Sequence, residues 1–201
     1  MRSKVEVNAD QALKVIDLST TQLIKKFDTD FTQEVIEYAS KFFENVENVK
    51  SCIQCATCTG SCPSGRETAW RVRKLIRQIQ LGLKNAAIRN DVLWDCTTCY
   101  TCQERCPRLI PITDIVRAVR NIAVRNGFML PRHVQVAGLM IKHGHAVPIN
   151  DEVKAVRKEI GLSELPPTVH SYPDALGEVK KLLDETGFTK LVEEASKGVQ
   201  K

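Results

Sequence analysis

Apolar residues recur at three- and four-residue intervals along two segments of the chain, and this period is typical of an amphipathic α-helix. In the first segment, residues 71–83, basic residues occupy half of the other positions. In the second segment, Thr113 and Asp114 suit a first helical turn and Asn126-Gly127 suits a helix end. We therefore predict one helix in each segment. The two apolar stripes are Val72, Leu75, Ile76, Ile79 and Leu83, and then Ile112, Ile115, Val116, Val119, Ile122 and Ala123.

Four further segments carry helical signals. Residues 31–46 have an apolar face, Pro131 opens a segment that Gly144 ends, and residues 151–160 and 174–185 show shorter patterns of the same kind. Pro166-Pro167 marks a linker. No run of alternating apolar and polar residues is longer than a few positions. The predicted fold class is therefore all-α, with cysteine-rich loops between the helices.

The chain contains an internal repeat that is built on cysteine. Residues 52–63 read CIQCATCTGSCP and residues 96–107 read CTTCYTCQERCP, so both follow the pattern C-x2-C-x2-C-x3-C-P. A basic, amphipathic segment follows each run, at residues 69–75 and 114–120. A cysteine loop followed by a helix therefore occurs twice. All 8 cysteines of the 201-residue chain fall in the two runs.

Cysteines grouped in this way indicate metal binding. Their share of the chain is far below that of a disulfide scaffold, and no export signal accompanies them. A [4Fe–4S] cluster needs four thiolates, and three cysteines at two-residue spacing let one short loop ligate three irons. Zinc also binds C-x2-C pairs, but four cysteines and a proline in each run favour iron and sulfur. The sequence predicts two [4Fe–4S] clusters.

The fourth cysteine of each run has a separate predicted role. In two-cluster ferredoxins this cysteine ligates the cluster of the other run. The proline that follows it turns the chain away from the loop and suits the first turn of a helix. Our hypothesis is that Cys62 and Cys106 each ligate the cluster of the other run. The first cluster then takes Cys52, Cys55, Cys58 and Cys106, and the second takes Cys96, Cys99, Cys102 and Cys62.

The net charge of +5 is too mild to predict nucleic-acid binding by itself. The basic segment after Cys62 leaves three roles open: a solvated face, cations that raise the reduction potential of a nearby cluster, or a docking surface for a redox partner. We expect Trp70 and Trp94, which each lie near a cysteine run, to shield the clusters from water. The histidines show no metal-binding spacing and are expected at the surface: His133, His143, His145 and His170.

The sequence gives little support for a nucleotide, flavin or catalytic site, or for export or membrane insertion. The chain has no glycine-rich nucleotide-binding motif and no pattern of a nucleophile with its base, so we expect no catalytic residues and no flavin site. The N-terminal segment lacks an apolar run of signal-peptide length. The apolar stretch at residues 136–141 is far too short to cross a bilayer. We expect a cytoplasmic protein without direct membrane insertion.

With a helical insert between its two cysteine runs, the chain resembles the α-helical ferredoxin family. This family includes iron–sulfur subunits of succinate dehydrogenase, glycolate oxidase and heterodisulfide reductase. The succinate dehydrogenase subunit carries additional cysteines in an N-terminal domain, whereas this chain has none before Cys52. Residues 52–63, residues 94–102 and Pro131-Arg132-His133 are similar to the C subunit of the soluble heterodisulfide reductases of methanogenic archaea. We predict an N-terminal helical extension at 1–50, a two-cluster core at 51–130 and a C-terminal helical extension for partner docking at 131–201.

The resemblance implies an electron-transfer subunit without an active site of its own. In that family, the C subunit relays electrons from the flavin-containing A subunit to the B subunit, which reduces the heterodisulfide of coenzymes M and B during methanogenesis. A hydrogenase or a formate dehydrogenase supplies the electrons. One alternative is the same module in a glycolate- or lactate-oxidising complex or in a disulfide reductase of sulfate reducers. Another is an interaction protein with structural clusters, although a structural role needs only one cluster.

Overall fold

The computed structural model describes residues 30–199, and every regular element in this range is helical. The predicted all-α class is confirmed for the described residues, which contain no strand. They divide into two compact units, one up to Ala118 and the other from Val119 onward. The three segments predicted from the sequence, with boundaries at 50/51 and 130/131, stay a prediction.

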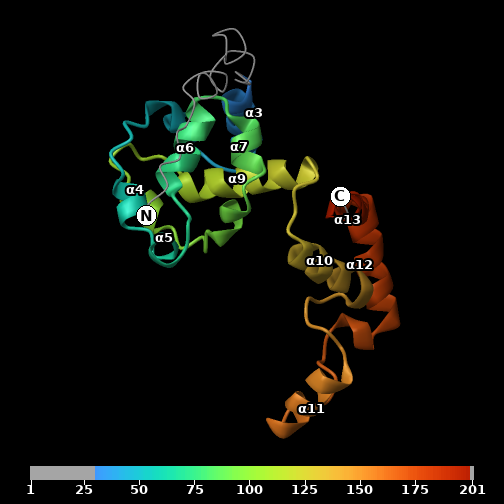
Figure 1. Cartoon of the computed structure of the whole chain (residues 1–201). Helices are drawn as coiled ribbons and strands as arrows, with labels where there is room; N and C mark the ends of the chain where they lie inside the picture. The colour runs from blue at the N-terminus through green and yellow to red at the C-terminus, as the bar shows by residue number, and fades with distance from the viewer. Residues whose placement is uncertain (1–29, 200–201) are drawn as a thin grey trace, which may run out of the picture. The chain divides into compact units, whose positions relative to one another are not determined.

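The first unit contains the two cysteine runs and a series of short helices (Figure 1). Helices α3 and α7 both pack on α6, and α4 packs on α8. Its elements, with η for a 3₁₀ helix, are α3 (Phe31–Ala39), η1 (Val46–Ser51), α4 (Thr57–Gly60), α5 (Ser64–Glu67), α6 (Val72–Gln80), α7 (Lys84–Ile88), η2 (Asp91–Asp95), α8 (Thr101–Glu104) and the first half of α9 (Ile112–Arg125).

The apolar stripe of α6 forms part of the core of this unit. Its four stripe residues from Val72 to Ile79 are almost completely buried. Helix α3 is fastened to the end of α6, because the Thr32 hydroxyl donates to the Ile79 carbonyl at 2.6 Å. The helix stops one residue after Ile79, since Gly82 adopts a left-handed φ of 64° and the following N–H turns back to the Gln78 carbonyl. Leu83 therefore lies outside α6, which corrects its predicted place on the stripe.

Helix α9 agrees with its prediction in extent and in its buried face. All six predicted stripe residues, from Ile112 to Ala123, are buried. The helix ends at Arg125, and Gly127 has the left-handed φ of 79° that the Asn126-Gly127 pair predicts.

The segment predicted as one helix from residue 31 to residue 46 is shorter. Helix α3 ends at Ala39, and Asn45 adopts a left-handed φ of 57° before η1 begins. Phe42, predicted on the buried face, is 66% exposed. Phe43 instead lies under the guanidinium of Arg117, 5.2 Å from its ring centroid. Phe43 thus packs against a charged side chain and Phe42 faces solvent, so neither extends the apolar face of the helix.

The second unit is built from α10 (Pro131–His143), α11 (Asp151–Glu159), η3 (Val169–Ser171), α12 (Pro173–Glu185) and α13 (Phe188–Val199). Helices α10, α12 and α13 pack against one another, while α11 stands apart from them in Figure 1. Three of these helices match the predicted segments, and α13 was not predicted. Gly144 ends α10 with a φ of 73° as expected. None of the described helices combines the length and apolar character that crossing a bilayer requires.

Candidate iron–sulfur site

The two cysteine loops share one backbone conformation. Gln54 and Ala56 have positive φ angles of 59° and 68°, and Thr98 and Tyr100, at the same places in the second run, have 53° and 63°. Few residues other than glycine adopt this region, so its use at matching positions marks a fixed loop shape. Each loop continues into a single helical turn, α4 or α8, and these turns pack together. The sequence repeat is therefore also a structural repeat, and it places the two runs side by side.

Each loop also holds the helix that follows it. The residue after the third cysteine caps that helix: the Thr59 hydroxyl accepts from the Arg73 N–H at 2.9 Å, and the Gln103 side-chain oxygen accepts from the Thr113 N–H at 3.1 Å. Both N–H groups lie second in their helices, where no intrahelical acceptor exists. The loops and the helices α6 and α9 are thereby held in one geometry.

The eight predicted ligands line two separate cavities. Each cavity is lined by the first three cysteines of one run and by the fourth cysteine of the other run. Other residues of the runs and of α6 and α9 complete both linings, together with Arg108 and Ile110 in the first and Trp70 in the second. The first cavity has Cys52, Cys55, Cys58 and Cys106, and the second has Cys96, Cys99, Cys102 and Cys62.

The second and fourth cysteines of the runs differ in exposure in the same way in both cavities. Cys55 and Cys99, the second cysteines of their runs, are exposed. Both fourth cysteines, Cys62 and Cys106, are buried. Each cavity therefore has an inner end and an end near solvent, and the near end is where another molecule can approach.

Exposure and hydrogen bonding set the acidity of these thiols. The Thr57 hydroxyl lowers the pKa of Cys55, and the Thr101 hydroxyl lowers the pKa of Cys99. Burial raises the pKa of Cys58 and raises that of Cys102 to about 11. Because metals bind the thiolate, the thiols of Cys58 and Cys102 must lose their protons to bind one, and metal binding there releases protons.

Hydrogen-bond donors surround the sulfur atoms. The Gly65 N–H donates to Cys62 Sγ at 3.3 Å, and the Gln54 side-chain amide donates to Cys52 Sγ at 3.4 Å. Trp70, 3% exposed, lines the second cavity, and its Nε1–H is buried without an acceptor among the described atoms. A buried donor without a partner costs about 1–3 kcal/mol, so an acceptor is expected there. Thiolate and sulfide sulfur are such acceptors, and the residues of this cavity fit a [4Fe–4S] cluster.

Charge distinguishes the two cavities. Two arginines, Arg73 and Arg108, line the first cavity. The described residues that line the second cavity include no Lys, Arg, Asp or Glu. A [4Fe–4S] cluster with four thiolates carries net negative charge, so the first cavity also suits it.

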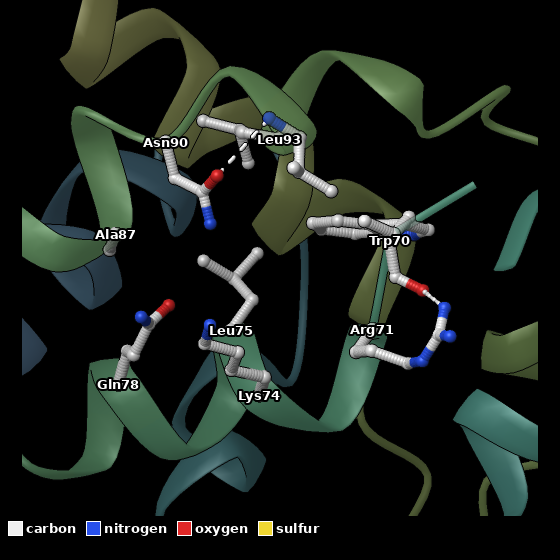
Figure 2. A pocket seen from close by; sticks show the side chains of 10 residues that line it. Trp70, Arg71, Lys74, Leu75, Gln78, Ala87, Asn90 and Leu93 are labelled. Atoms are coloured by element: carbon white, nitrogen blue, oxygen red, sulfur yellow. Dashed lines mark hydrogen bonds between the residues drawn. The ribbon is translucent and has the colours of Figure 1, made fainter. Parts of the chain in front are cut away.

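Of the two tryptophans expected to shield the clusters, only Trp70 lines one of the cavities. Its ring also lines one end of a separate pocket that contains no cysteine and lies between α6, α7 and η2. Figure 2 shows this pocket with Leu75, Gln78 and Leu93. The Arg71 side chain folds beneath the ring and donates to the Trp70 carbonyl at 2.8 Å. Trp94 is half-buried and lines neither cysteine cavity.

Three of the histidines come together in the second unit. The ring centroids of His143 and His145 are 6.2 Å apart, and those of His145 and His170 are 5.2 Å apart. These three histidines are not arranged to hold a metal ion together with other described residues. His145 Nδ1 accepts the Val147 N–H at 3.2 Å, so the packing of these rings is part of the turn after α10.

Sequence reasoning missed the residues that support the cysteines. Thr57 and Thr101 occupy the same place in both runs, two residues after the second cysteine, and each hydroxyl lies 3.4–3.5 Å from that cysteine's sulfur. Thr59 and Gln103 are also at equivalent positions, although their side chains differ. Aligning the two runs beyond their cysteines was the signal that could have found them.

The sequence is similar to those of known proteins. The family described as a 4Fe–4S dicluster domain matches residues 48–110. The iron–sulfur C subunit of the CoB–CoM heterodisulfide reductase of Methanopyrus kandleri is 54% identical over 81% of this chain and 86% of that protein. The C subunit of the H2:CoB–CoM heterodisulfide, ferredoxin reductase of Methanothermobacter thermautotrophicus is 53% identical, over 73% and 79%. The C subunit of the ferredoxin:CoB–CoM heterodisulfide reductase of Methanosarcina mazei is 52% identical, over 73% and 91%. The chain therefore belongs to the family of heterodisulfide reductase C subunits.

Proposed function

We propose that this chain is the electron-transfer subunit of a heterodisulfide reductase and that it holds two [4Fe–4S] clusters. The observation that carries the proposal is the presence of two cavities, each lined by three cysteines of one run and the fourth of the other. When bound, such clusters supply one-electron oxidation and reduction. The chain's own residues provide the thiolates, the N–H donors and the cations around them.

The proposed ligand sets follow the cavity linings. The buried Cys62 and Cys106 complete the inner ends of the sets, and the exposed Cys55 and Cys99 lie at the ends near solvent. The first cluster is held by Cys52, Cys55, Cys58 and Cys106, and the second by Cys96, Cys99, Cys102 and Cys62.

The proposed partners are the A and B subunits of the same heterodisulfide reductase. This chain takes electrons from the flavin-containing A subunit and passes them to the B subunit, which reduces the heterodisulfide of coenzymes M and B. The names of the relatives support membership of a complex, since each is called a C subunit. The name of one relative begins with H2 and that of another with ferredoxin, and the two relatives are 53% and 52% identical to this chain, so identity alone does not choose between these donors. A hydrogenase or a formate dehydrogenase is the donor proposed upstream of the A subunit.

Matched serine variants test the ligand sets. In the anaerobically purified chain, Cys106→Ser should alter the electron paramagnetic resonance (EPR) spectrum of the cluster held by Cys52, Cys55 and Cys58, because it replaces that cluster's fourth thiolate. Cys62→Ser should alter the other spectrum. Cys58→Ser and Cys102→Ser provide reference spectra for the two clusters. The assignment is wrong if Cys106→Ser reproduces the change that Cys102→Ser causes.

Reconstitution tests the proposed place in the enzyme. The purified A and B subunits together with this chain should reduce the heterodisulfide with a reduced donor, and omission of this chain should abolish turnover. A chain that carries both clusters yet leaves the rate unchanged would rule out the relay. Co-purification with a glycolate- or lactate-oxidising enzyme in place of the A and B subunits would favour the alternative complex.

A further inference from the structure

A broad groove along α6 carries positive charge beside the first cysteine run. Its cationic residues come from α6 and the residue before it, and two of its polar residues come from the cysteine loop. Among the described residues that line it there is no carboxylate. The lining consists of Gln54, Thr59, Arg71, Arg73, Lys74, Arg77, Gln78, Leu81 and Leu83.

Three of these cationic side chains form no ion pair with any described residue. Arg71 is occupied, because its guanidinium donates to the carbonyls of Gly65, Thr68 and Trp70 at 2.8–2.9 Å. The side chains of Arg73, Lys74 and Arg77 are exposed and form no ion pair with any described residue. Like charges within about one helical turn repel one another, so the groove is stabilised by an anionic surface laid against it.

The second half of the repeat shows that this charge is not a general property of the helix after a cysteine run. Since Thr59 caps Arg73 as Gln103 caps Thr113, Lys74 corresponds to Asp114. Asp114 is buried, accepts from the Tyr100 hydroxyl at 3.2 Å and pairs with Arg117 at 3.4 Å. The first repeat has a lysine where the second has this neutralising carboxylate.

The groove is continuous with the first cysteine cavity. Arg73 and Gln54 line both of them. Cys55, next to Gln54, is the exposed cysteine of that cavity, and Ile53 beside it is 64% exposed. A protein seated on the groove therefore also covers the solvent-facing end of the cavity. An apolar residue surrounded by polar and charged groups is a usual arrangement for a protein interface.

We propose that this groove is the docking surface for an acidic face of the partner protein that exchanges electrons with the first cluster. The proposal rests on the proposed electron-transfer function and adds which face of the chain the partner meets and what charge it carries. A nucleic acid fits less well, because the described lining contains no aromatic residue on which a base could stack.

The test compares two charge reversals of equal size. Lys74→Glu with Arg77→Glu reverses the groove, and Lys180→Glu with Lys181→Glu reverses two exposed lysines on α12. Each full-length chain, with its clusters, is reduced with dithionite and mixed separately with the purified A subunit and the purified B subunit. Stopped-flow absorbance follows reoxidation of the chain at a series of salt concentrations. The EPR spectra of both clusters report whether the variants are folded and loaded.

The groove variant should exchange electrons with one of the two subunits about tenfold more slowly than the wild type at low salt, and the difference should shrink as salt rises. The α12 variant should match the wild type. Unchanged rates for the groove variant with both subunits would overturn the proposal, as would loss of salt-sensitive DNA binding without any loss of electron exchange. Failure of the loaded wild-type chain to react with either subunit would instead count against the proposed function.

Discussion

Trp70 is the residue whose role depends most directly on what occupies the second cavity. Its Nε1–H is buried and lacks an acceptor among the described atoms. A hydrogen bond to cluster or thiolate sulfur stabilises the more negative, reduced state and so raises the reduction potential. Trp70→Phe removes this donor while keeping most of the ring. We expect the potential of the second cluster to fall by roughly 40 mV, the equivalent of about 1 kcal/mol for one electron.

Redox titration followed by EPR measures this shift, and the first cluster serves as an internal control. Its potential should stay unchanged, because Trp70 does not line the first cavity. An equal shift of both clusters would point to a general loosening of the fold. No shift of the second cluster would show that the indole N–H has another acceptor.

The pH dependence of the second unit should depend on His145. Burial lowers the pKa of His145, and His170 and His143 lower it further. In the unfolded chain the pKa returns to about 6.5, so the unfolded state binds more protons between the two values. The contribution of neutral His145 to the free energy of unfolding is therefore fully present above about pH 6.5, and it is lost as the pH falls toward the pKa of the folded state.

Hydrogen exchange of residues 143–147 at pH 5.5 and 7.5, corrected for intrinsic rates, checks this expectation. The amides should open more readily at the lower pH. His145→Gln, which cannot take up a proton in this range, should remove most of the difference. Equal opening of the wild type at both pH values would contradict the assignment.

At the scale of elements, the two helix caps should be equivalent in energy. Thr59→Val removes the acceptor for the Arg73 N–H, and Gln103→Met removes the one for the Thr113 N–H. Loss of a side-chain cap usually costs about 1 kcal/mol. We expect each change to lower the free energy of unfolding by about that amount in anaerobic denaturation of the loaded chain.

Gln33→Met is a suitable control for Gln103→Met. Gln33 is exposed on α3 and bonds only to Glu37 of the same helix at 3.1 Å among the described atoms. Its replacement should change stability by less than about 0.5 kcal/mol. A loss as large as that of Gln103→Met would mean that the cap is not the reason for the effect.

The predictability of an element depended on its length. The stripes of α6 and α9 were long enough to show a period of 3.6, and every predicted stripe residue except Leu83 lies on a buried helix face. The single turns α4 and α8 contain too few residues for any period. The single turn α5 was not predicted either, and Arg71 holds the stretch between it and α6 by donating to the carbonyls of Gly65 and Thr68.

The candidate site was more predictable than the fold around it. The cysteine spacing indicated two runs of four, and the rule for two-cluster ferredoxins suggested the exchange of the fourth cysteines. The cavity linings group the cysteines in the same way, and the ligand sets stay a prediction. The supporting groups depend on contacts between distant parts of the chain. Arg73 of α6 lines the first cavity and Thr113 of α9 lines the second only because these helices pack beside the cysteine loops.

At the scale of the whole molecule, we expect a conductor without catalysis of its own. The full-length chain purified alone should contain about eight iron atoms, as two [4Fe–4S] clusters require. Dithionite should bleach its absorbance, and no heterodisulfide should be reduced. Iron analysis measures the iron content, absorbance follows the bleaching, and a thiol-release assay detects any reduction of the heterodisulfide. Turnover by the chain alone would show a substrate site that neither cysteine cavity explains.

The exchange of fourth cysteines between the two runs has a consequence for the topology of the chain. Cys58 and Cys106 line one cavity from opposite sides of the sequence that joins the runs, and Cys62 and Cys102 line the other. A group bound across either cavity closes a covalent ring of about 40 to 50 residues, which by the loop-entropy relation used for disulfides stabilises the native state by about 4 kcal/mol. The two rings overlap along the same stretch of chain, so neither run can be released alone. Oxidative loss of one cluster should therefore loosen both loops together.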